Sequence, residues 1–206
     1  MNKDEAKVMV DGDWPAGTNY VDEANLPAAF FENAATGGDT KLLFEKRDGE
    51  WIGHSWNFVA DKVARLASVL VDAGVSAGDR VLVTAENRPE WAIADLAVMA
   101  IGAIVVPAYT TNTEDDHHFI IDHSGASVAI TSGEMLATRV CLAAERASAL
   151  KTLITMDPDF NSPKLKRTKL LDWTQALEAT APLADLDARM AALHPDDVCC
   201  FIYTSG

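Results

Sequence analysis

The sequence is poor in basic residues relative to acidic ones. It holds 17 Lys and Arg against 31 Asp and Glu, and its formal net charge is -14. Proteins that bind nucleic acids contact phosphates through clustered Lys and Arg, so this composition argues against a nucleic-acid-binding protein. Any anionic ligand must therefore be held by local dipoles and backbone donors rather than by the charge of the whole chain.

Long apolar runs are also missing. The longest, residues 96–109, is shorter than the roughly 20 residues that a membrane-spanning helix needs, and Gly102 and Pro107 divide it. It predicts a buried helix followed by a strand. The first residues are charged and do not lead into the apolar core of a secretory signal, so we expect no export and a cytoplasmic location.

Cysteine is scarce, with residues only at Cys141, Cys199 and Cys200. Their spacing matches no metal site, and an adjacent pair does not form an ordinary structural disulfide, which fits a reducing compartment. Cys199 and Cys200 lie in a predicted buried strand, so packing is the default interpretation and nucleophilic catalysis the remote one.

What the chain does contain is enough apolar sequence, 49% of 206 residues, for a large domain or part of one. After an irregular N-terminal arm, residues 1–40, two β-prone runs flank Asp48-Gly49, a dipeptide suited to a tight hairpin turn. Ser55 then predicts the start of an amphipathic helix that ends near Gly74.

From there short apolar strands alternate with helices. The predicted strands are residues 81–83, 104–106, 127–130, 153–155 and 198–203, with Pro89 in the first turn of one intervening helix and Asn112 or Thr113 capping the next. Residues 157–169 predict a surface loop, and a short helix follows near Trp173. This alternation predicts an α/β fold with a mainly parallel sheet, helices on both faces, and a small β-hairpin before it.

Thr204-Ser205-Gly206 follows the last predicted strand. Ligands of open α/β sheets bind beyond the carboxyl ends of strands, where hydroxyls and free backbone N–H groups can donate to phosphate oxygens. Thr131-Ser132-Gly133 has the same surroundings in sequence, so the tripeptide alone is a weak signal, and an ordinary turn is the competing interpretation.

A resemblance distinguishes the second copy. The stretch from Ser55 through GDRV, ENRPEW and VPAYTTNT is similar to the opening of acyl-CoA synthetases, and FIYTSG resembles the start of the glycine-rich phosphate loop of the adenylate-forming superfamily. ENRPEW, VPAYTTNT and IDHSGASVAITS look most like the long-chain fatty acyl-CoA ligases. The resemblance begins at about Trp51 and covers nearly all of the chain that follows.

The resemblance implies a fatty acyl-CoA synthetase that uses ATP, Mg²⁺ and CoA and forms an acyl-adenylate. It implies that residues 41–206 are the first part of the AMP-binding large domain, interrupted in the phosphate loop, with the C-terminal domain absent. Only Thr204, Ser205 and Gly206 can be carried over, as ATP phosphate-binding residues, and no catalytic or metal-binding residue can be named. Peripheral contact with a membrane remains open.

We therefore expect the chain alone to be inactive, and to self-associate through the sheet surface that later elements normally cover. The alternative is a non-catalytic binding or structural module that keeps the fold without a complete active site. An unrelated nucleotide-binding α/β protein fits poorly, because neither G-x-G-x-x-G nor G-x-x-x-x-G-K occurs.

Other candidate sites are weaker. His117, His118 and His123 have spacings that do not bring three rings together, so they predict a solvated helix face rather than a metal site. Glu114, Asp115 and Asp116 are interpreted as partners of a helix dipole. In ENRPEW, Asn87, Arg88 and Glu90 follow a predicted strand, and a functional interpretation places them near the ligand crevice. The favoured interpretation is structural, with Asn87 as a helix cap and Arg88 as a surface charge. No Ser-His-Asp set can be assembled from the spacing.

Overall fold

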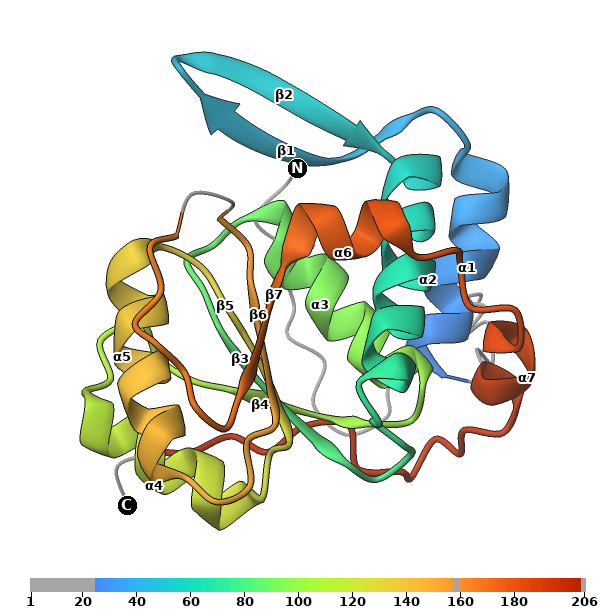
Figure 1. Cartoon of the computed structure of the whole chain (residues 1–206). Helices are drawn as coiled ribbons and strands as arrows, with labels where there is room; N and C mark the ends of the chain where they lie inside the picture. Colours follow the sequence, from blue (N-terminus) through green and yellow to red (C-terminus); the bar gives the residue numbers. More distant parts are fainter. Residues whose placement is uncertain (1–24, 158–159, 205–206) are drawn as a thin grey trace, which may run out of the picture.

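A computed structural model describes residues 25–157 and 160–204 of the chain (Figure 1). The helices are α1 (Leu26–Gly37), α2 (Trp56–Asp72), α3 (Pro89–Ala100), α4 (Glu114–Ser124), α5 (Glu134–Arg146), α6 (Trp173–Ala179) and α7 (Leu186–Ala191). The strands are β1 (Lys41–Arg47), β2 (Glu50–Ser55), β3 (Arg80–Thr84), β4 (Ile104–Pro107), β5 (Val128–Thr131), β6 (Thr152–Thr155) and β7 (Lys169–Asp172).

Five strands form one sheet in the order β4-β3-β5-β6-β7, and every pair in it is parallel. Val81 of β3 pairs with Val105 on one side and with Val128 on the other, so β3 is an interior strand, as predicted. β1 and β2 form a separate antiparallel hairpin. The predicted fold class, a parallel α/β sheet with a preceding hairpin, is confirmed.

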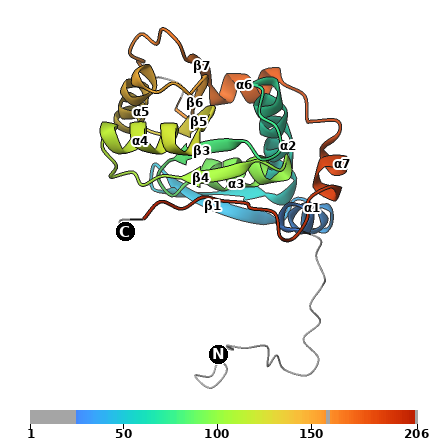
Figure 2. The same ribbon diagram turned by 90° about the horizontal axis from the view of Figure 1, so that it is seen from below.

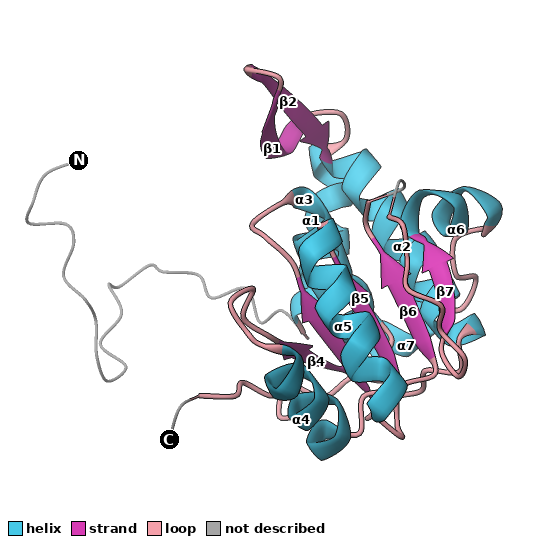
Figure 3. Ribbon diagram, turned by 60° about the vertical axis from the view of Figure 1, so that its left-hand side comes forward, coloured by secondary structure: helices cyan, strands magenta, loops and turns pink. Residues whose placement is uncertain are grey.

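Helices cover both faces of this sheet, and Figure 3 shows α4 and α5 in front of it. Side chains on successive strand residues point to opposite faces. Accordingly, Val81 and Val83 join the core that contains residues of α2 and α3, whereas Leu82 joins the core that contains residues of α4 and α5. β3 is therefore buried on both faces, which explains its uniformly apolar sequence.

Local signals in the sequence account for most element boundaries. The hairpin turn has positive φ at both Asp48 and Gly49. The Ser55 hydroxyl accepts a hydrogen bond from the backbone N–H of Phe58 and so caps α2. Pro89 begins α3, and Thr113 caps α4. Each of these was predicted from the residue type at that position.

Three helices or strands were not predicted. Helix α1 lies inside the stretch interpreted as an irregular arm; Asn25 caps it, and its Phe30 ring lies 5.7 Å from the ring of Trp56 on α2. Strand β7 begins at Lys169, the last residue of the predicted surface loop, and α7 follows the predicted short helix. Unlike the equally short β5 and β6, β7 is partly exposed and lacks a uniformly apolar run, and a six-residue helix carries too little periodicity to be recognised. The rest of the predicted arm, residues 1–24, lies outside the described residues.

Among the residues that the structure describes, no helix is long and apolar enough to cross a membrane.

Candidate functional site

Residues 198–204, here called the edge segment, run alongside β4 at the border of the sheet (Figure 2). The Val105 N–H donates to the Cys199 carbonyl, and the Phe201 N–H donates to the Val105 carbonyl, both at 2.9 Å. This parallel bridge, Val105 with Cys200, carries the chain past Pro107, the last residue of β4. Thr204 therefore lies on the side of the sheet where the strands have their carboxyl ends.

The edge segment does not form the buried strand that its apolar sequence predicted. It makes one isolated bridge, and Val198 and Ile202 are 56% and 66% exposed. It pairs only with β4, and no layer of described residues covers it, so its apolar side chains stay open to solvent. Cys199 and Cys200 are exposed as well, which corrects the prediction that they are packed. Partial burial and the neighbouring Cys199 raise the pKa of Cys200, which disfavours the nucleophilic thiolate.

An aromatic cluster packs the edge segment against α4. The Tyr203 hydroxyl lies 2.8 Å from Nδ1 of His123. The Tyr203 ring meets the rings of Phe119 and His123 edge to face, with centroids 6.2 and 5.6 Å away. These contacts were not predicted, because His123 and Tyr203 are 80 residues apart in the sequence.

Two hollows lie beside the cluster, at the carboxyl ends of β3 and β4. One, of about 360 Å³, is lined by Pro107, Ala108, Tyr109, Asn112, Asp116, Phe119, Ile120, Tyr203 and Thr204. The other, of about 510 Å³, is lined by Ala85, Glu86, Asn87, Trp91, Pro107, Ala108, Tyr109, Thr110, Ile202 and Tyr203. This is the edge of an α/β sheet at which ligands are expected to bind.

Thr204 is the one predicted phosphate-binding residue that the structure describes. It is exposed and lines the smaller hollow. Ser205 and Gly206 lie outside the described residues. Sequence reasoning missed Tyr109 and Asn112 as lining residues, and their only signal was a position directly after a buried strand.

At the first Thr-Ser-Gly copy, residues 131–133, carboxylates of the protein itself accept the available hydrogen bonds. Ser132 is fully buried; its hydroxyl donates to the Glu86 carboxylate and accepts from the Glu86 backbone N–H. The Gly133 N–H donates to the Asp157 carboxylate. These donors are satisfied, and the two carboxylates would repel a phosphate, so this copy is a structural junction.

Arg88 takes part in the same junction. Its guanidinium lies 2.8 Å from the Glu90 carboxylate and 3.0 Å from that of Asp157. Hydrogen bonds to Glu90 first, and also to Asp157, raise the pKa of Arg88. Arg88 is therefore a half-buried, ion-paired residue and not the free surface charge that was predicted. Asn87 does not cap α3 either, because Arg88 holds the cap position and no side chain makes the capping hydrogen bond.

The three histidines of α4 have separate environments. His123 is exposed, and Nε2 of His118 lies 3.2 Å from the Asp122 carboxylate. His117 is 0% exposed, and neither of its ring nitrogens has a hydrogen-bond partner among the described residues, so its assignment to a solvated face was wrong. Burial lowers the pKa of His117, as does nearby Arg139, while Asp116 opposes the shift.

The acidic residues before these histidines lie in the first turn of α4, as predicted. Thr113 and Asp116 form a reciprocal capping box, and hydrogen bonds from the Thr113 backbone and side chain lower the pKa of Asp116. Glu114 and Asp115 both bind Arg146, at 3.0 and 2.7 Å. Within residues 25–157 and 160–204, no group of three or more His, Cys, Asp and Glu side chains is placed to hold a metal ion.

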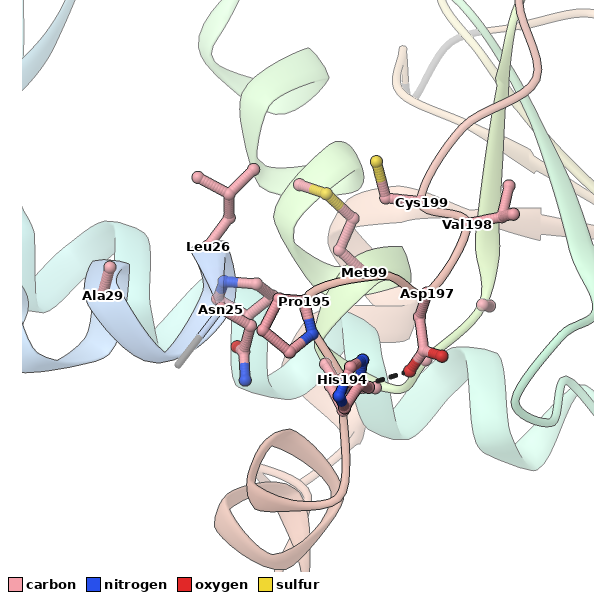
Figure 4. A pocket seen from close by; sticks show the side chains of 13 residues that line it. Asn25, Leu26, Ala29, Met99, His194, Pro195, Asp197, Val198 and Cys199 are labelled. Atoms are coloured by element: carbon pink, nitrogen blue, oxygen red, sulfur yellow. Dashed lines mark hydrogen bonds between the residues drawn. The ribbon is translucent and has the colours of Figure 1, made fainter. Parts of the chain in front are cut away.

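A third hollow, of about 360 Å³, opens at the other end of β4, beside Gly102 and Ala103 (Figure 4). Met99, Pro195 and Val198 give it a mainly apolar lining. It lies at the amino end of β4, where parallel sheets do not place their catalytic groups. We therefore assign the candidate site to the carboxyl edge, next to Thr204.

Among curated proteins, the chain is similar to long-chain-fatty-acid-CoA ligase FadD15 of Mycobacterium tuberculosis. The two are 31% identical over 192 residues, which are 93% of this chain and 31% of that protein. It is also 26% identical to long-chain-fatty-acid-CoA ligase ACSBG2 of Gallus gallus, over 86% of this chain and 23% of that protein. The chain thus spans less than a third of the length of these relatives.

Among solved structures, a benzoate CoA ligase from Burkholderia xenovorans matches with a TM-score of 0.69 at 24% identity, over 86% of this chain and 32% of that one. The A domain of a carboxylic acid reductase from Segniliparus rugosus, in complex with AMP and a carboxylic acid, matches with a TM-score of 0.71 at 17% identity, over 87% and 34%. These likenesses establish the fold. The family match establishes more: residues 30–206 fit the family described as AMP-binding enzyme, and the chain belongs to that family.

Proposed function

We propose that the chain is part of an acyl-CoA ligase that activates a fatty acid. In the reaction, the fatty carboxylate attacks the α-phosphate of ATP to give an acyl-adenylate and pyrophosphate. The CoA thiol then attacks the acyl carbon and displaces AMP. Family membership supports this reaction class, and the names of the two curated relatives support a long-chain fatty acid as the substrate.

One observation supports placing the ATP phosphates beside Thr204. The edge segment runs parallel to β4 and brings Thr204 to the hollow at the carboxyl edge. We propose that the hydroxyls of Thr204 and Ser205 and the backbone N–H groups up to Gly206 donate to the ATP phosphates. Glycine at the third position lets the main chain approach a phosphate closely because no Cβ intervenes.

The described residues supply only part of such a site. A polyanionic phosphate needs charge screening in the transition state, for which Mg²⁺ and a cationic side chain are the usual means. Arg88, the cation beside Asn87 at the carboxyl edge, is engaged by two carboxylates. Among the described residues, no group of three or more His, Cys, Asp and Glu side chains is placed to hold a metal ion. We propose that the Mg²⁺, adenine and CoA contacts come from sequence that this chain does not contain.

We propose that residues 41–206 form the first part of the AMP-binding large domain and that residues 1–40 precede it. As a separate protein, the chain then neither adenylates fatty acids nor binds ATP tightly.

Calorimetric titration of Mg-ATP into two proteins tests this proposal. One is the 206-residue chain, and the other is a form lengthened with the coding sequence that follows Gly206. We expect saturable heat and pyrophosphate release with palmitate and CoA only from the longer form, and weaker ATP binding when Thr204→Val is introduced there. Turnover by the short chain contradicts the incomplete site. A longer form without turnover or nucleotide binding supports instead a non-catalytic module that retains the fold.

A further inference from the structure

The β1–β2 hairpin stands apart from the parallel sheet. Figures 1 and 3 show it extending from the end of the molecule that carries the start of α2, with its turn pointing away from the body. The turn residues Asp48 and Gly49 are exposed. A two-stranded hairpin gains little stability by itself, so the character of its exposed side chains calls for a physical explanation.

Cross-strand pairing divides these side chains between two faces. Phe44 lies opposite Gly53, and Lys46 lies opposite Trp51. Directly opposed residues share a face, and faces alternate along a strand, so these two pairs lie on one side of the hairpin. The intervening pairs, such as Glu45 with Ile52, lie on the other side.

The surroundings of Gly53 place Lys41 on the same side of the hairpin as Phe44 and Trp51. A Cβ placed on Gly53 would come within 3.0 Å of both the Lys41 Cγ and the Phe44 Cε1 atoms. The aliphatic stem of Lys41 and the ring of Phe44 therefore lie over the bare glycine backbone. We call the surface made by Lys41, Phe44, Lys46, Trp51 and Gly53 the Trp51 face.

Two large aromatic side chains on this face remain open to solvent. Trp51 is 69% exposed and Phe44 is 57% exposed. Either one alone would be unremarkable, but they occupy successive pairs of the same hairpin face. Packing against the rest of the described chain does not account for them.

The charges of the two faces differ. On the opposite face, Oε1 of Glu45 lies 2.9 Å from both Arg47 and His54, and these contacts lower the pKa of Glu45 against the effect of its burial. On the Trp51 face, neither Lys41 nor Lys46 takes part in an ion pair with any described residue. A chain with a net charge of -14 thus presents a face with two unpaired cations and no carboxylate of its own.

We propose that the Trp51 face binds the surface of an anionic lipid bilayer. Indole and phenyl rings partition into the boundary between headgroups and acyl chains, which provides a place for Trp51 and Phe44. Lysine stems can lie along the apolar boundary while their ammonium groups meet lipid phosphates, which suits Lys41 and Lys46. The net negative charge of the whole chain opposes contact through its other surfaces, so binding is restricted to this face. The inference stands independently of the proposed ligase activity.

Co-sedimentation of the 206-residue chain with vesicles tests the inference. The vesicles are pure phosphatidylcholine in one series and phosphatidylcholine with phosphatidylglycerol in the other. We expect binding only in the second series, with a loss of affinity as sodium chloride is raised. In Lys41→Gln/Lys46→Gln the affinity for anionic vesicles falls roughly tenfold or more. In Phe44→Ser/Trp51→Ser, binding falls to the level seen with neutral vesicles.

Matched variants distinguish a specific role of the Trp51 face from a general effect of removing positive charge or an apolar side chain. Lys164→Gln/Lys166→Gln removes the same charge from an exposed loop, and Ile52→Ser removes an apolar side chain from the opposite hairpin face; both should bind like the parent. Circular dichroism and thermal unfolding confirm that each variant is folded. Anionic vesicles that fail to bind the parent, or that bind all variants equally, overturn the inference. So does a lipid-free dimer that the Trp51 substitution dissociates, because the face then belongs to a second copy.

Discussion

The tripeptide Thr-Ser-Gly occurs twice in this chain, each time after a β-prone run, and the two places have opposite surroundings. At the first, Ser132 is fully buried at the end of β5, between β3 and β6. At the second, Thr204 is exposed beyond the end of β4, at the border of the sheet. A motif search would treat these sites as equivalent.

Their neighbours distinguish them. Glu86 and Asp157 accept hydrogen bonds from Ser132 and Gly133 of the first copy. Arg88 forms ion pairs with both Asp157 and Glu90. These contacts join the loops after β3, β5 and β6 in one junction. Thr204 adjoins a hollow instead. The availability of hydrogen-bond donors, which depends on residues distant in sequence, thus decides whether such a tripeptide can bind a ligand.

The largest expected difference between the two places comes from Gly133→Ala. Gly133 has φ +66° and ψ 141°, in a region essentially restricted to glycine, and an added Cβ would lie 3.2 Å from Oε1 of Glu86. We expect the free energy of unfolding to fall by about 2–3 kcal/mol. Urea unfolding followed by tryptophan fluorescence measures it. Thr204→Val is the control and should stay within about 0.5 kcal/mol of the parent. Equal losses of unfolding free energy in the two variants would contradict the proposed difference between the two Thr-Ser-Gly copies.

A smaller loss is expected for Ser132→Ala. The substitution leaves the Glu86 backbone N–H and carboxylate without the buried hydroxyl, and we expect a cost of about 1–2 kcal/mol in the free energy of unfolding. Glu86→Gln retains a hydrogen-bonding side chain and should cost less. If Ser132→Ala is neutral in urea unfolding, the junction does not depend on this hydroxyl.

His117→Leu tests the buried side of α4, whose exposed side holds the edge segment. Burial lowers the pKa of His117 in the folded state, so the unfolded chain binds the proton more readily below about pH 6.5. The His117 contribution is therefore present above that pH and is lost as the pH falls towards the folded pKa. The loss amounts to at most about 1.4 kcal/mol per pH unit.

The measurement is the urea midpoint of parent and His117→Leu at several values between pH 7.5 and about pH 5. We expect the parent to lose more stability over this range than the variant. His118→Gln, at a partly exposed site, is the control for general acid effects. Parallel pH profiles for the parent and His117→Leu would mean that His117 does not titrate differently on folding.

Much of the fold was predictable because local chemistry marks its boundaries. Ser55, Pro89 and Thr113 each begin a helix for reasons contained in a few neighbouring residues. Helix α1 was missed because its stability depends on packing against α2, and β7 because it is partly exposed and requires β6 beside it. Propensity and periodicity describe a segment alone, whereas these elements depend on partners.

The candidate site was less predictable. Sequence placed Thr204 after a strand, but the strand was expected to be buried, and it lies exposed along β4. Arg88 and His117 were assigned to the surface because their partners and coverings come from other parts of the chain. Burial of a polar side chain is a tertiary property, and a charged or imidazole group gives little local sign of it.

The smallest predicted effect concerns how firmly the edge segment is held. In Tyr203→Phe, the hydroxyl that contacts His123 is lost while the ring remains, so the free energy of unfolding should change by no more than about 0.5 kcal/mol. Local opening should become easier, and the backbone amide of Phe201, which donates to Val105, should exchange its hydrogen a few times faster. Tyr109→Phe, at an exposed residue of the same edge, should leave this rate unchanged. If Tyr203→Phe also leaves it unchanged, ring packing and the backbone bridge suffice to hold Thr204 at the carboxyl edge, and the difference between the two tripeptides does not depend on the His123 contact.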